Sequence, residues 1–541
     1  MNRETIRDQG WLGLVMAAAT VLWLDAPPLF DWDEINFAES AREMLVTGDF
    51  FRVRINYQPF WEKPPLFFWM QALCMAVLGT GELAARLPNA IFGVITVLTL
   101  YQKGLIIKDI LLARLLALLY MASMLPMIYS KSGIIDPVFN YFIFLGILHL
   151  YHYEIGQQRH HPVWAGLWIG IATLTKGPVA LLVTGLVYGL YVMIYRRKQI
   201  PWVAAGIFGL AWAVPVIGWY GLETAVHGWW FLEKFIAYQA ELFTQGVAGH
   251  EQPVYYHILV FLPGCFPMAA FVFRAMWHKT ETPEDQVLHR IMLIWFWVVL
   301  VVFSLATTKI VHYASLLYVP SVFLSALWLH HLIQTGARLR AESWVILGLG
   351  ILVWGGGSLA LGWATRHRET LAGWIADPLG QASLQVAVPW TGYEGLIGLG
   401  FVLGAGYGLW LLARRRYLTY LMVQAAVTLV FLNLHMRFTV PLIAQHTQGA
   451  PMAFFSKLEG QDVYVATASY KSYLPYFYAR VRPGDLRASD MTWLQSGDID
   501  KPVYLAAKTH QITPSFRETY SQFQWQYDAG GFSFFCRLPA H

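Results

Sequence analysis

Long apolar runs separated by short polar segments constrain this chain more than any other feature. Over roughly the first 440 of its 541 residues the runs recur at lengths near 20 residues, which is about the length that a helix needs to cross a bilayer. Hydrophobic residues make up 57% of the chain and charged residues only 13%, whereas soluble domains are about one quarter charged. This balance excludes a disordered chain and argues against a soluble enzyme. The sequence predicts a polytopic membrane protein.

About 13 crossings are expected, with one further apolar helix over 66–79 that is too short to span and suits the membrane interface. The expected spans lie near 11–28, 87–107, 112–131, 137–155, 163–178, 179–195, 201–220, 254–277, 290–308, 311–333, 342–363, 394–413 and 417–440.

Basic clusters between these runs give the orientation. Those at 196–198, 338–340 and 414–416 fall on one side of the predicted topology, together with the N-terminus. The positive-inside rule makes that side cytoplasmic. The net charge of +5 therefore reflects membrane topology, and no nucleic-acid partner is expected.

The chain changes character near residue 440. The sequence predicts a transmembrane domain over 1–440, whose first outer loop covers 29–86 and carries interfacial helices. Residues 441–541 have ordinary polarity and short β-like runs at 463–466, 503–506, 524–527 and 532–538. They predict a small α/β domain on the non-cytoplasmic side.

The first outer loop holds the most informative charges. Asp33 and Glu34 directly follow the first span, and Glu62 and Lys63 come later in the same loop. A carboxylate at the mouth of a membrane helix can serve as a general base, and a lysine can hold a phosphate as a point charge. A solvated loop with interfacial anchors is the alternative reading of either motif.

Two more outer-face charges border predicted spans. Asp136 precedes Pro137, so a helix N-cap is an alternative to a chemical role. Lys176 lies at a turn between two apolar runs. A lysine at membrane depth is a functional candidate by default, although snorkelling to the surface competes with that reading.

A third outer turn carries Lys309, His312 and Tyr313, and loop 221–253 carries His250. All of these charges fall on one predicted face, whereas unrelated snorkelling residues would occupy both faces. Acids and lysines gathered on one face predict a site for a negatively charged, lipid-linked substrate.

Several ordered motifs resemble the lipid A aminoarabinose transferases, which are relatives of the protein O-mannosyltransferases. The likeness covers about residues 20–330, and beyond 330 only the layout agrees. The motifs that carry the resemblance are Asp33-Glu34-x-x-Phe37-Ala38-Glu39-x-Ala41-Arg42-Glu43-Met44, Trp61-Glu62-Lys63-Pro64-Pro65, Ala85-Arg86-Leu87-Pro88, Leu174-Thr175-Lys176-Gly177-Pro178, the stretch 231–256 ending in Gly249-His250-Glu251-Gln252-Pro253-Val254-Tyr255-Tyr256, and Lys309-x-x-His312-Tyr313 followed by Pro320.

The resemblance implies the mainly α GT-C membrane fold and a polyprenyl-phosphate sugar donor, typically undecaprenyl phosphate, used at the periplasmic face of a bacterial inner membrane. It places Asp33 at the catalytic carboxylate, with Glu34 beside it in the same motif, and Asp136 at a second acid. It assigns Lys63 to the donor phosphate. Substrate-binding roles are further expected for Glu62, Lys176, Lys309, His312 and Tyr313.

No cofactor is required by this resemblance, and a divalent metal shared by Glu62 and His250 stays open. Asn36 stands where the family commonly has an arginine, so a phosphate-facing cation is either absent or replaced by another residue such as Arg52 or Arg54. The predicted function is an inverting glycosyltransferase that acts on a lipid A-like or other lipid or glycan acceptor. The alternative is a flippase or transporter of lipid-linked saccharides, which predicts polar groups on both faces and internal repeats.

Overall fold

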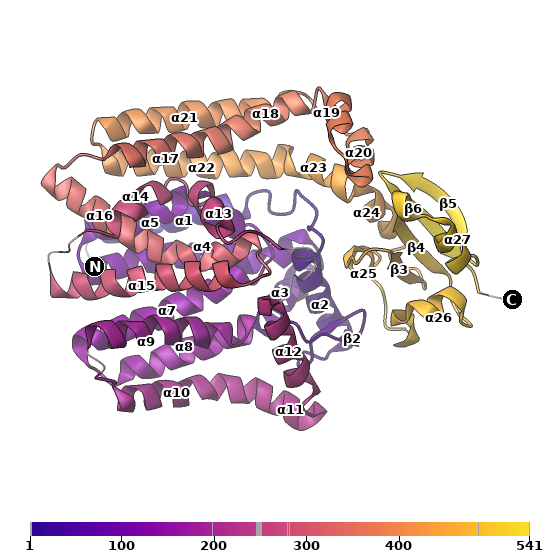
Figure 1. Cartoon of the computed structure of the whole chain (residues 1–541), viewed down its shortest axis with the longest axis horizontal. Coiled ribbons are helices and arrows are strands. Elements are labelled where there is room, and N and C mark those ends of the chain that lie inside the picture. The colour runs from indigo at the N-terminus through magenta and orange to yellow at the C-terminus, as the bar shows by residue number, and fades with distance from the viewer. Residues whose placement is uncertain are drawn as a thin grey trace.

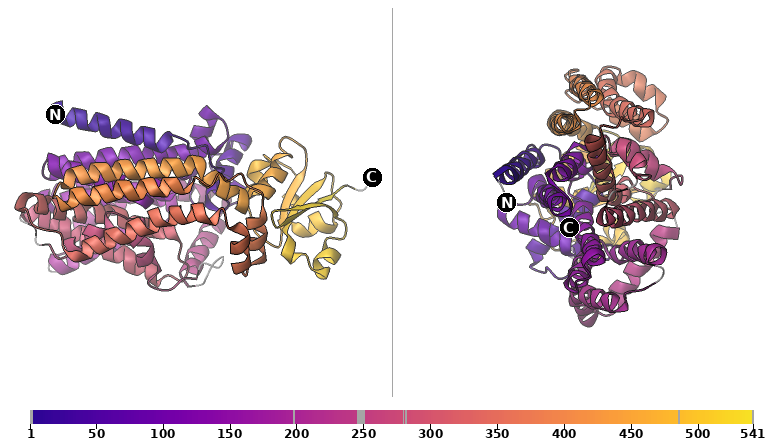
Figure 2. Two further views of the ribbon diagram at one scale, coloured as in Figure 1. Left: turned by 90° about the horizontal axis from the view of Figure 1, so that it is seen from above. Right: turned by 90° about the vertical axis from the view of Figure 1, so that its left-hand side faces the viewer.

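The computed structural model describes residues 3–196, 199–244, 251–278, 280, 282–484 and 486–539. The chain is mainly helical, and its long helices run side by side along the long axis of the molecule (Figure 1). A small domain with a β-sheet lies at one end of this bundle, and the two termini lie at opposite ends of the long axis (Figure 2).

The first part of the chain forms ten α-helices and one short hairpin within the described residues. In the hairpin, β1 (Arg54–Ile55) pairs antiparallel with β2 (Gln58–Pro59). The helices are α1 (Arg3–Val21), α2 (Asp33–Thr47), α3 (Leu66–Leu78), α4 (Glu82–Ile107), α5 (Ile110–Ala122), α6 (Met124–Tyr129), α7 (Asp136–Gly156), α8 (His160–Lys176), α9 (Val179–Tyr195) and α10 (Trp202–Val216).

The first helix differs from the predicted span over 11–28. It begins at Arg3 and ends at Val21, so polar N-terminal residues are helical and the last predicted turns are not. Pro27 and Pro28 follow the turn after the helix, and a proline cannot continue a helix because it lacks the N–H donor.

The second part of the bundle continues with shorter helices and then returns to long ones. Its elements are η1 (Ile217–Gly221), α11 (Leu222–His227), α12 (Trp230–Thr244), α13 (Tyr256–Gly264), α14 (Ala269–Ala275), α15 (Pro283–Leu305), η3 (Val311–Leu317), α16 (Tyr318–Thr335), α17 (Ala341–Ile351), η4 (Leu352–Gly356), α18 (Gly357–Ala364), α19 (Arg368–Trp374), α20 (Pro378–Gln385), α21 (Gly395–Ala413) and α22 (Tyr417–Phe438).

Local sequence signals start some of these helices. Thr282 caps α15 by accepting a hydrogen bond from the Asp285 N–H at 3.1 Å, with Pro283 at the first helical position. Asp109 caps α5 in the same way at 2.8 Å from the Leu112 N–H. Both caps satisfy backbone donors that the first turn would otherwise leave without partners.

Seven helices of the described residues are long and apolar enough to cross a membrane, or eight if the bent pair α13–α14 is one span. The chain is therefore a multi-pass membrane protein, while the count of 13 crossings remains a prediction. The single crossing expected over 254–277 is not straight, because α13 and α14 are bent by 116° relative to each other. Pro263 and Pro267 remove backbone donors at this break.

The C-terminal domain contains a mixed four-stranded sheet in the order β3-β4-β6-β5. Strand β3 pairs parallel with β4, whereas β6 pairs antiparallel with both β4 and β5. The strands lie over the four β-like runs of the sequence. The elements are α23 (Val440–Thr447), α24 (Gly449–Ser456), β3 (Tyr464–Ala468), α25 (Leu474–Tyr478), η5 (Leu486–Ser489), α26 (Met491–Ser496), β4 (Val503–Lys508), η6 (Thr509–Gln511), α27 (Pro514–Thr519), β5 (Gln524–Ala529) and β6 (Phe532–Arg537).

Helix α2 lies between the end of the helical bundle and this domain (Figure 1). Both Arg42 and the hydroxyl of Tyr57 donate to the main-chain oxygen of Val481, at 2.8 and 2.6 Å. The hydroxyl of Tyr478 accepts a hydrogen bond from the Leu29 N–H at 3.1 Å. The C-terminal domain is thus bonded to α2, to the hairpin and to the segment that precedes α2.

Candidate active site

Asp33 is the first residue of α2, and its carboxylate stays accessible. The side chain is 41% exposed, and the His312 ring approaches it, with Nε2 at 3.6 Å from Oδ2. Trp32 before it has φ of 75°, an unfavourable value for a bulky residue, and such strain costs on the order of 1–3 kcal/mol. The Asp31 carboxylate supports this conformation by accepting the Trp32 N–H at 2.8 Å.

Asp136 and Lys176 form a buried ion pair. Lys176 Nζ lies 2.6 Å from Asp136 Oδ1, and the Ser315 hydroxyl donates to the same oxygen at 3.4 Å. Asp136 is the first residue of α7, and the N-cap position before it is Ile135, so Asp136 does not occupy the N-cap. Lys176 is only 14% exposed, so it turns inward rather than snorkelling to the surface.

Gly177 allows the chain to turn directly after Lys176. Its φ of 94° is unfavourable for residues with a side chain, and a Cβ would lie 2.5 Å from the Phe235 ring. The motif Lys176-Gly177 thus ends α8 where the lysine can face Asp136.

Lys63 and Glu62 bring the first outer loop to the same place. Burial lowers the pKa of Lys63, although the nearby Glu62 and Asp33 carboxylates oppose that effect. Lys63 Nζ lies 5.5 Å from the centre of the Tyr238 ring. Burial raises the pKa of Tyr238, and the Glu62 carboxylate raises it further. Lys63 is therefore a half-buried lysine held beside a phenol and acids.

A cavity of about 70 Å³ joins these groups. Lys63, Asp136, Lys176 and Tyr313 line it with Gln239, and its remaining wall is apolar: Phe139, Val179, Leu242, Phe303, Ala306 and Leu316. Asp33, Lys63, Asp136, Lys176 and His312 are called the cavity cluster below. They come from four separate segments of the chain, as the one-sided charge pattern predicts.

Lys309 lies apart from this cavity. It is buried in the turn between α15 and η3 and does not belong to the cavity lining. Its neighbours in the turn, His312 and Tyr313, do reach the site. Tyr313 lies beneath Lys176, whose Nζ is 5.0 Å from the ring centre.

Glu34 follows Asp33 but points to a different part of the molecule. Its two oxygens accept hydrogen bonds from Arg86 at 3.0 and 2.7 Å and from the backbone N–H groups of Phe30 and Gly133 at 3.0 and 2.6 Å. Burial raises the pKa of Glu34, but Arg86 and these donors outweigh it, so the pKa lies below its ordinary value.

The hydrogen-bond donors of the Arg86 side chain are occupied as well. It donates to the main-chain oxygens of Leu24, Pro27 and Pro28 at 2.7 to 3.0 Å. Glu34 and Arg86, called the anchor pair below, therefore tie the start of α2 to α4 and to the segment that follows α1.

A second cavity, of about 520 Å³, lies against the anchor pair. Lys131 and His435 contribute to its wall, which is otherwise mostly apolar and comes largely from η4, α18 and α22. Lys131 is held by hydrogen bonds from Nζ to the oxygens of Ala19, Thr20 and Leu22 at 2.9 to 3.2 Å. The volume and the wall suit a hydrocarbon chain.

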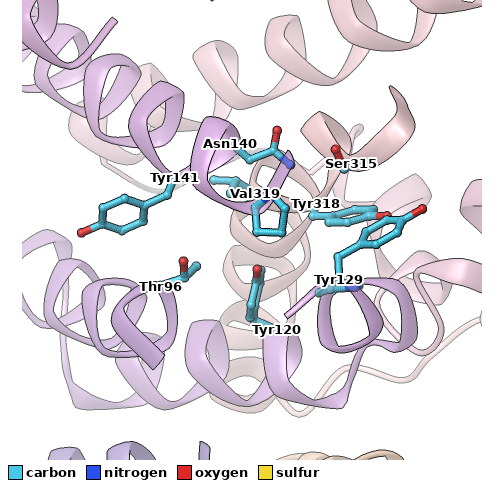
Figure 3. A pocket seen from close by; sticks show the side chains of 10 residues that line it. Thr96, Tyr120, Tyr129, Asn140, Tyr141, Ser315, Tyr318 and Val319 are labelled. Carbon is cyan, nitrogen blue, oxygen red and sulfur yellow. The ribbon is translucent and has the colours of Figure 1, made fainter. Parts of the chain in front are cut away.

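Behind Asp136 lies a third cavity of only about 20 Å³, enough for one water molecule. Figure 3 shows its polar lining, which includes Ser315, Asn140 and Tyr318. The Asn140 Oδ1 atom and the Tyr318 hydroxyl are buried without a hydrogen-bond partner among the described residues.

The residues expected to replace the missing arginine are engaged elsewhere. Asn36 is buried in α2. Arg52 lies 3.6 Å from Glu223 and stacks on Trp230, and Arg54 pairs with Asp49 at 2.8 Å. His250, the second member of the expected metal pair, lies outside the described residues.

Sequence reasoning missed Lys471, which the C-terminal domain brings to within 3.9 Å of Glu62. The motif resemblance ends near residue 330, so it carries no information about this residue. The available signal for Lys471 was its place in a short aromatic loop after a strand, Tyr470-Lys471-Ser472-Tyr473.

Comparisons with known proteins agree with this architecture. The sequence model of the family described as dolichyl-phosphate-mannose-protein mannosyltransferase matches residues 62–219. An undecaprenyl phosphate-alpha-4-amino-4-deoxy-L-arabinose arabinosyl transferase from Pectobacterium carotovorum is 26% identical over 64% of this chain and 63% of its own length. Its counterpart from Pseudomonas paraeruginosa is 28% identical over 61% and 60%. The matches thus span about six tenths of these relatives.

The solved structure of ArnT from Cupriavidus metallidurans bound to undecaprenyl phosphate superposes with a TM-score of 0.72 at 20% identity, covering 97% of this chain and 98% of the other. The resemblance predicted from the motifs is therefore confirmed. The chain has the GT-C fold of that protein and is related in sequence to the aminoarabinose transferases.

Proposed function

We propose that this chain is an inner-membrane glycosyltransferase that moves a sugar from a polyprenyl phosphate, typically undecaprenyl phosphate, to a lipid A-like or other envelope acceptor. The observation that carries the proposal is the cavity cluster. It combines an accessible carboxylate, Asp33, with two lysines that line a largely apolar cavity, as a lipid-linked phosphate donor requires. The sequence relatives point to the same donor class, since their names specify an undecaprenyl phosphate-linked sugar.

Lys63 binds the donor phosphate in this proposal, and Lys176 holds Asp136 beside it. Polyprenyl phosphate leaves as the bond between the anomeric carbon and the phosphate oxygen breaks, and the nearby cations stabilise its added charge. The acceptor oxygen forms the new bond from the opposite face of the sugar, so the anomeric centre is inverted. Asp33 takes the proton of a hydroxyl acceptor, or orients a phosphate acceptor that needs no deprotonation.

Glu34 is a positioning residue in this scheme and does not react. Its oxygens are occupied by Arg86 and two backbone donors, so it holds the start of α2 in place while Asp33 reacts. The expected catalytic role of Glu34 is replaced by this positioning role.

No cofactor takes part in the proposed reaction, because lysines supply the positive charge that the leaving phosphate needs. Among the described residues, no three His, Cys, Asp or Glu side chains are arranged to hold a metal ion. A divalent metal would therefore depend on Glu62 and on His250, which lies outside the described residues.

The proposed topology has about 13 crossings, a cytoplasmic N-terminus and the domain 441–541 in the periplasm. It follows from the positive-inside rule and agrees with the termini at opposite ends of the molecule (Figure 2). The transporter alternative is not favoured. It predicts polar groups on both faces and internal repeats, whereas the sequence pattern is one-sided and without a repeat, and the relatives are named as transferases.

The test uses the purified full chain in liposomes with labelled undecaprenyl phosphate-linked aminoarabinose and lipid A. Wild-type protein should transfer the label, and Asp33→Asn should lose about 10²- to 10⁴-fold in rate because the acceptor loses its base or orienting group. Asp462→Asn, at an exposed carboxylate of the C-terminal domain, is the control and should keep the full rate. Wild-type turnover by Asp33→Asn would overturn the assignment.

A further inference from the structure

Lys471 is a cation that the C-terminal domain extends over the mouth of the active site. Its side chain is 56% exposed, and Nζ lies 3.9 Å from Glu62 Oε1. The same nitrogen lies 5.5 Å from the centre of the Trp32 ring and 5.2 Å from that of Tyr473. Lys471 thus stands beside the residue that directly precedes Asp33.

The ammonium of Lys471 is free to bind a ligand. Its contact with Glu62 is too long for a hydrogen bond, and no hydrogen bond from Nζ to another described residue is formed. Lys176, by contrast, is bonded to Asp136 at 2.6 Å. Of these two lysines, Lys471 keeps its N–H donors available for a ligand that comes from solution or from the membrane surface.

The loop that carries Lys471 is fixed to the start of α2. The Tyr473 N–H donates to Asp31 Oδ1 at 3.0 Å, and that oxygen also accepts the Trp32 N–H. The rings of Trp32 and Tyr473 meet edge to face with centres 6.1 Å apart. Lys471 and Asp33 are therefore held at a set separation by side chains from both domains.

Several carboxylates lie close to Lys471 and Asp33. Asp31 and Glu62 are among them, and Asn36 supplies no charge. Arg52 and Arg54, the expected replacements, are paired with Glu223 and Asp49. A cation near Asp33 favours an acceptor with a negative group, and Lys471, beside Trp32, supplies one.

We propose that Lys471 binds the anionic group of the acceptor, a phosphate carried on a lipid, and so selects acceptors by charge. A lysine binds phosphate as a compact point charge. Glu62 lies between the two lysines and separates the roles: Lys63 faces the donor phosphate and Lys471 faces the acceptor. The assignment of the ligand as the acceptor rests on the proposed transferase function.

A purely structural role would have Lys471 do no more than neutralise Glu62. The two roles differ in what a substitution changes. Loss of an acceptor contact weakens acceptor binding and leaves donor binding intact, whereas loss of neutralisation disturbs Glu62 and the neighbouring Lys63 and therefore changes donor binding.

The experiment uses the purified full chain in nanodiscs and measures binding of fluorescent lipid A, of the same lipid without its phosphates, and of undecaprenyl phosphate. Lys471→Ala should weaken binding of phosphorylated lipid A on the order of tenfold, as expected for loss of one charge-assisted contact. Binding of the other two lipids should not change, and Lys471→Arg should restore most of the loss. In transfer assays the KM for lipid A should rise while kcat stays near the wild-type value.

Lys501→Ala is the matched control. Lys501 belongs to the same domain, pairs with Asp462 at 2.7 Å and lies 5.6 Å from the Tyr464 ring, so it is a lysine beside a carboxylate and a tyrosine ring away from the site. This variant should bind all three lipids as the wild type does.

Several results would overturn the inference. They are wild-type affinity of Lys471→Ala for phosphorylated lipid A, equal losses for both forms of lipid A, a loss of undecaprenyl phosphate binding, and displacement of lipid A by an equal concentration of inorganic phosphate. If the wild type transfers no sugar but binds lipid A through Lys471, the transferase proposal fails and the phosphate site stands.

Discussion

Asp33 and Glu34 are neighbours in sequence, yet the structure gives them opposite surroundings. Glu34 is buried, and four hydrogen bonds from Arg86, Phe30 and Gly133 occupy its oxygens. Asp33 is 41% exposed, and the His312 ring lies 3.6 Å from its carboxylate. A carboxylate whose acceptor positions are all filled can hold a backbone in place, and one that is loosely held can accept a proton. The anchor pair therefore holds the backbone in place, whereas the cavity cluster carries the chemistry.

The largest effect should come from breaking the anchor pair. Glu34→Ala or Arg86→Met should destabilise the protein by about 3–5 kcal/mol, because the remaining partner is left buried and uncompensated. The unfolding temperature in nanodiscs measures this effect. Glu459→Ala is the control, since its ion pair with Arg480 at 2.9 Å is about half exposed and is expected to contribute no more than about 1 kcal/mol. Equal shifts in the two cases would contradict the anchor role.

A smaller effect should come from the ion pair of the cavity cluster. Lys176→Met and Asp136→Leu should each lower the transfer rate, and the double variant should lose less than the sum. A coupling of about 1–3 kcal/mol is expected for two groups in direct contact, measured as a double-mutant cycle on kcat/KM. Strict additivity would show that the 2.6 Å contact does not matter for turnover.

Lys63 predicts a pH dependence of donor binding. Because burial lowers the pKa of this lysine, its charge is present at low pH and is lost as pH rises through that lowered pKa. Affinity for undecaprenyl phosphate should therefore fall at a pH below the ordinary lysine range of about 10.4. Lys63→Arg should move the fall to higher pH, because arginine stays charged. Identical pH profiles for wild type and Lys63→Arg would remove Lys63 from the phosphate site.

The smallest effect should come from Ser315→Ala. The hydroxyl donates to Asp136 at 3.4 Å, which is a long hydrogen bond, so a loss of about 1 kcal/mol or less is expected. This corresponds to a rate reduction of roughly fivefold at most and no change in unfolding temperature. A loss as large as that of Lys176→Met would mean that the water-sized cavity behind Asp136 has a larger role.

Much of the fold was predictable, because membrane helices and short strands leave strong local patterns. The exceptions have local causes: the prolines at 27 and 28 follow the early end of α1, and the prolines at 263 and 267 accompany the 116° bend between α13 and α14. A hydropathy pattern indicates the length of an apolar segment but not the direction of its helix axis. The bend between α13 and α14 was therefore not predicted.

The site was predictable in its members but not in their roles. The residue types and the shared face indicate that Asp33, Lys63, Asp136 and Lys176 converge. They do not indicate that Asp136 pairs with a lysine 40 residues away, or that Glu34 turns away from its neighbour. Burial and pairing decide those roles, and both depend on tertiary packing. The place of Lys471 in the site could not be predicted for the same reason, since only the docking of the C-terminal domain brings it to Glu62.

The most direct test of the division between the two acids compares Asp33→Asn and Glu34→Gln in parallel, measuring sugar transfer and unfolding temperature on the same preparations. The account predicts that Asp33→Asn keeps the wild-type unfolding temperature and loses about 100-fold or more in transfer. Glu34→Gln should unfold at a lower temperature while its folded fraction still transfers sugar. Wild-type transfer by Asp33→Asn, or a stable but inactive Glu34→Gln, would contradict the account.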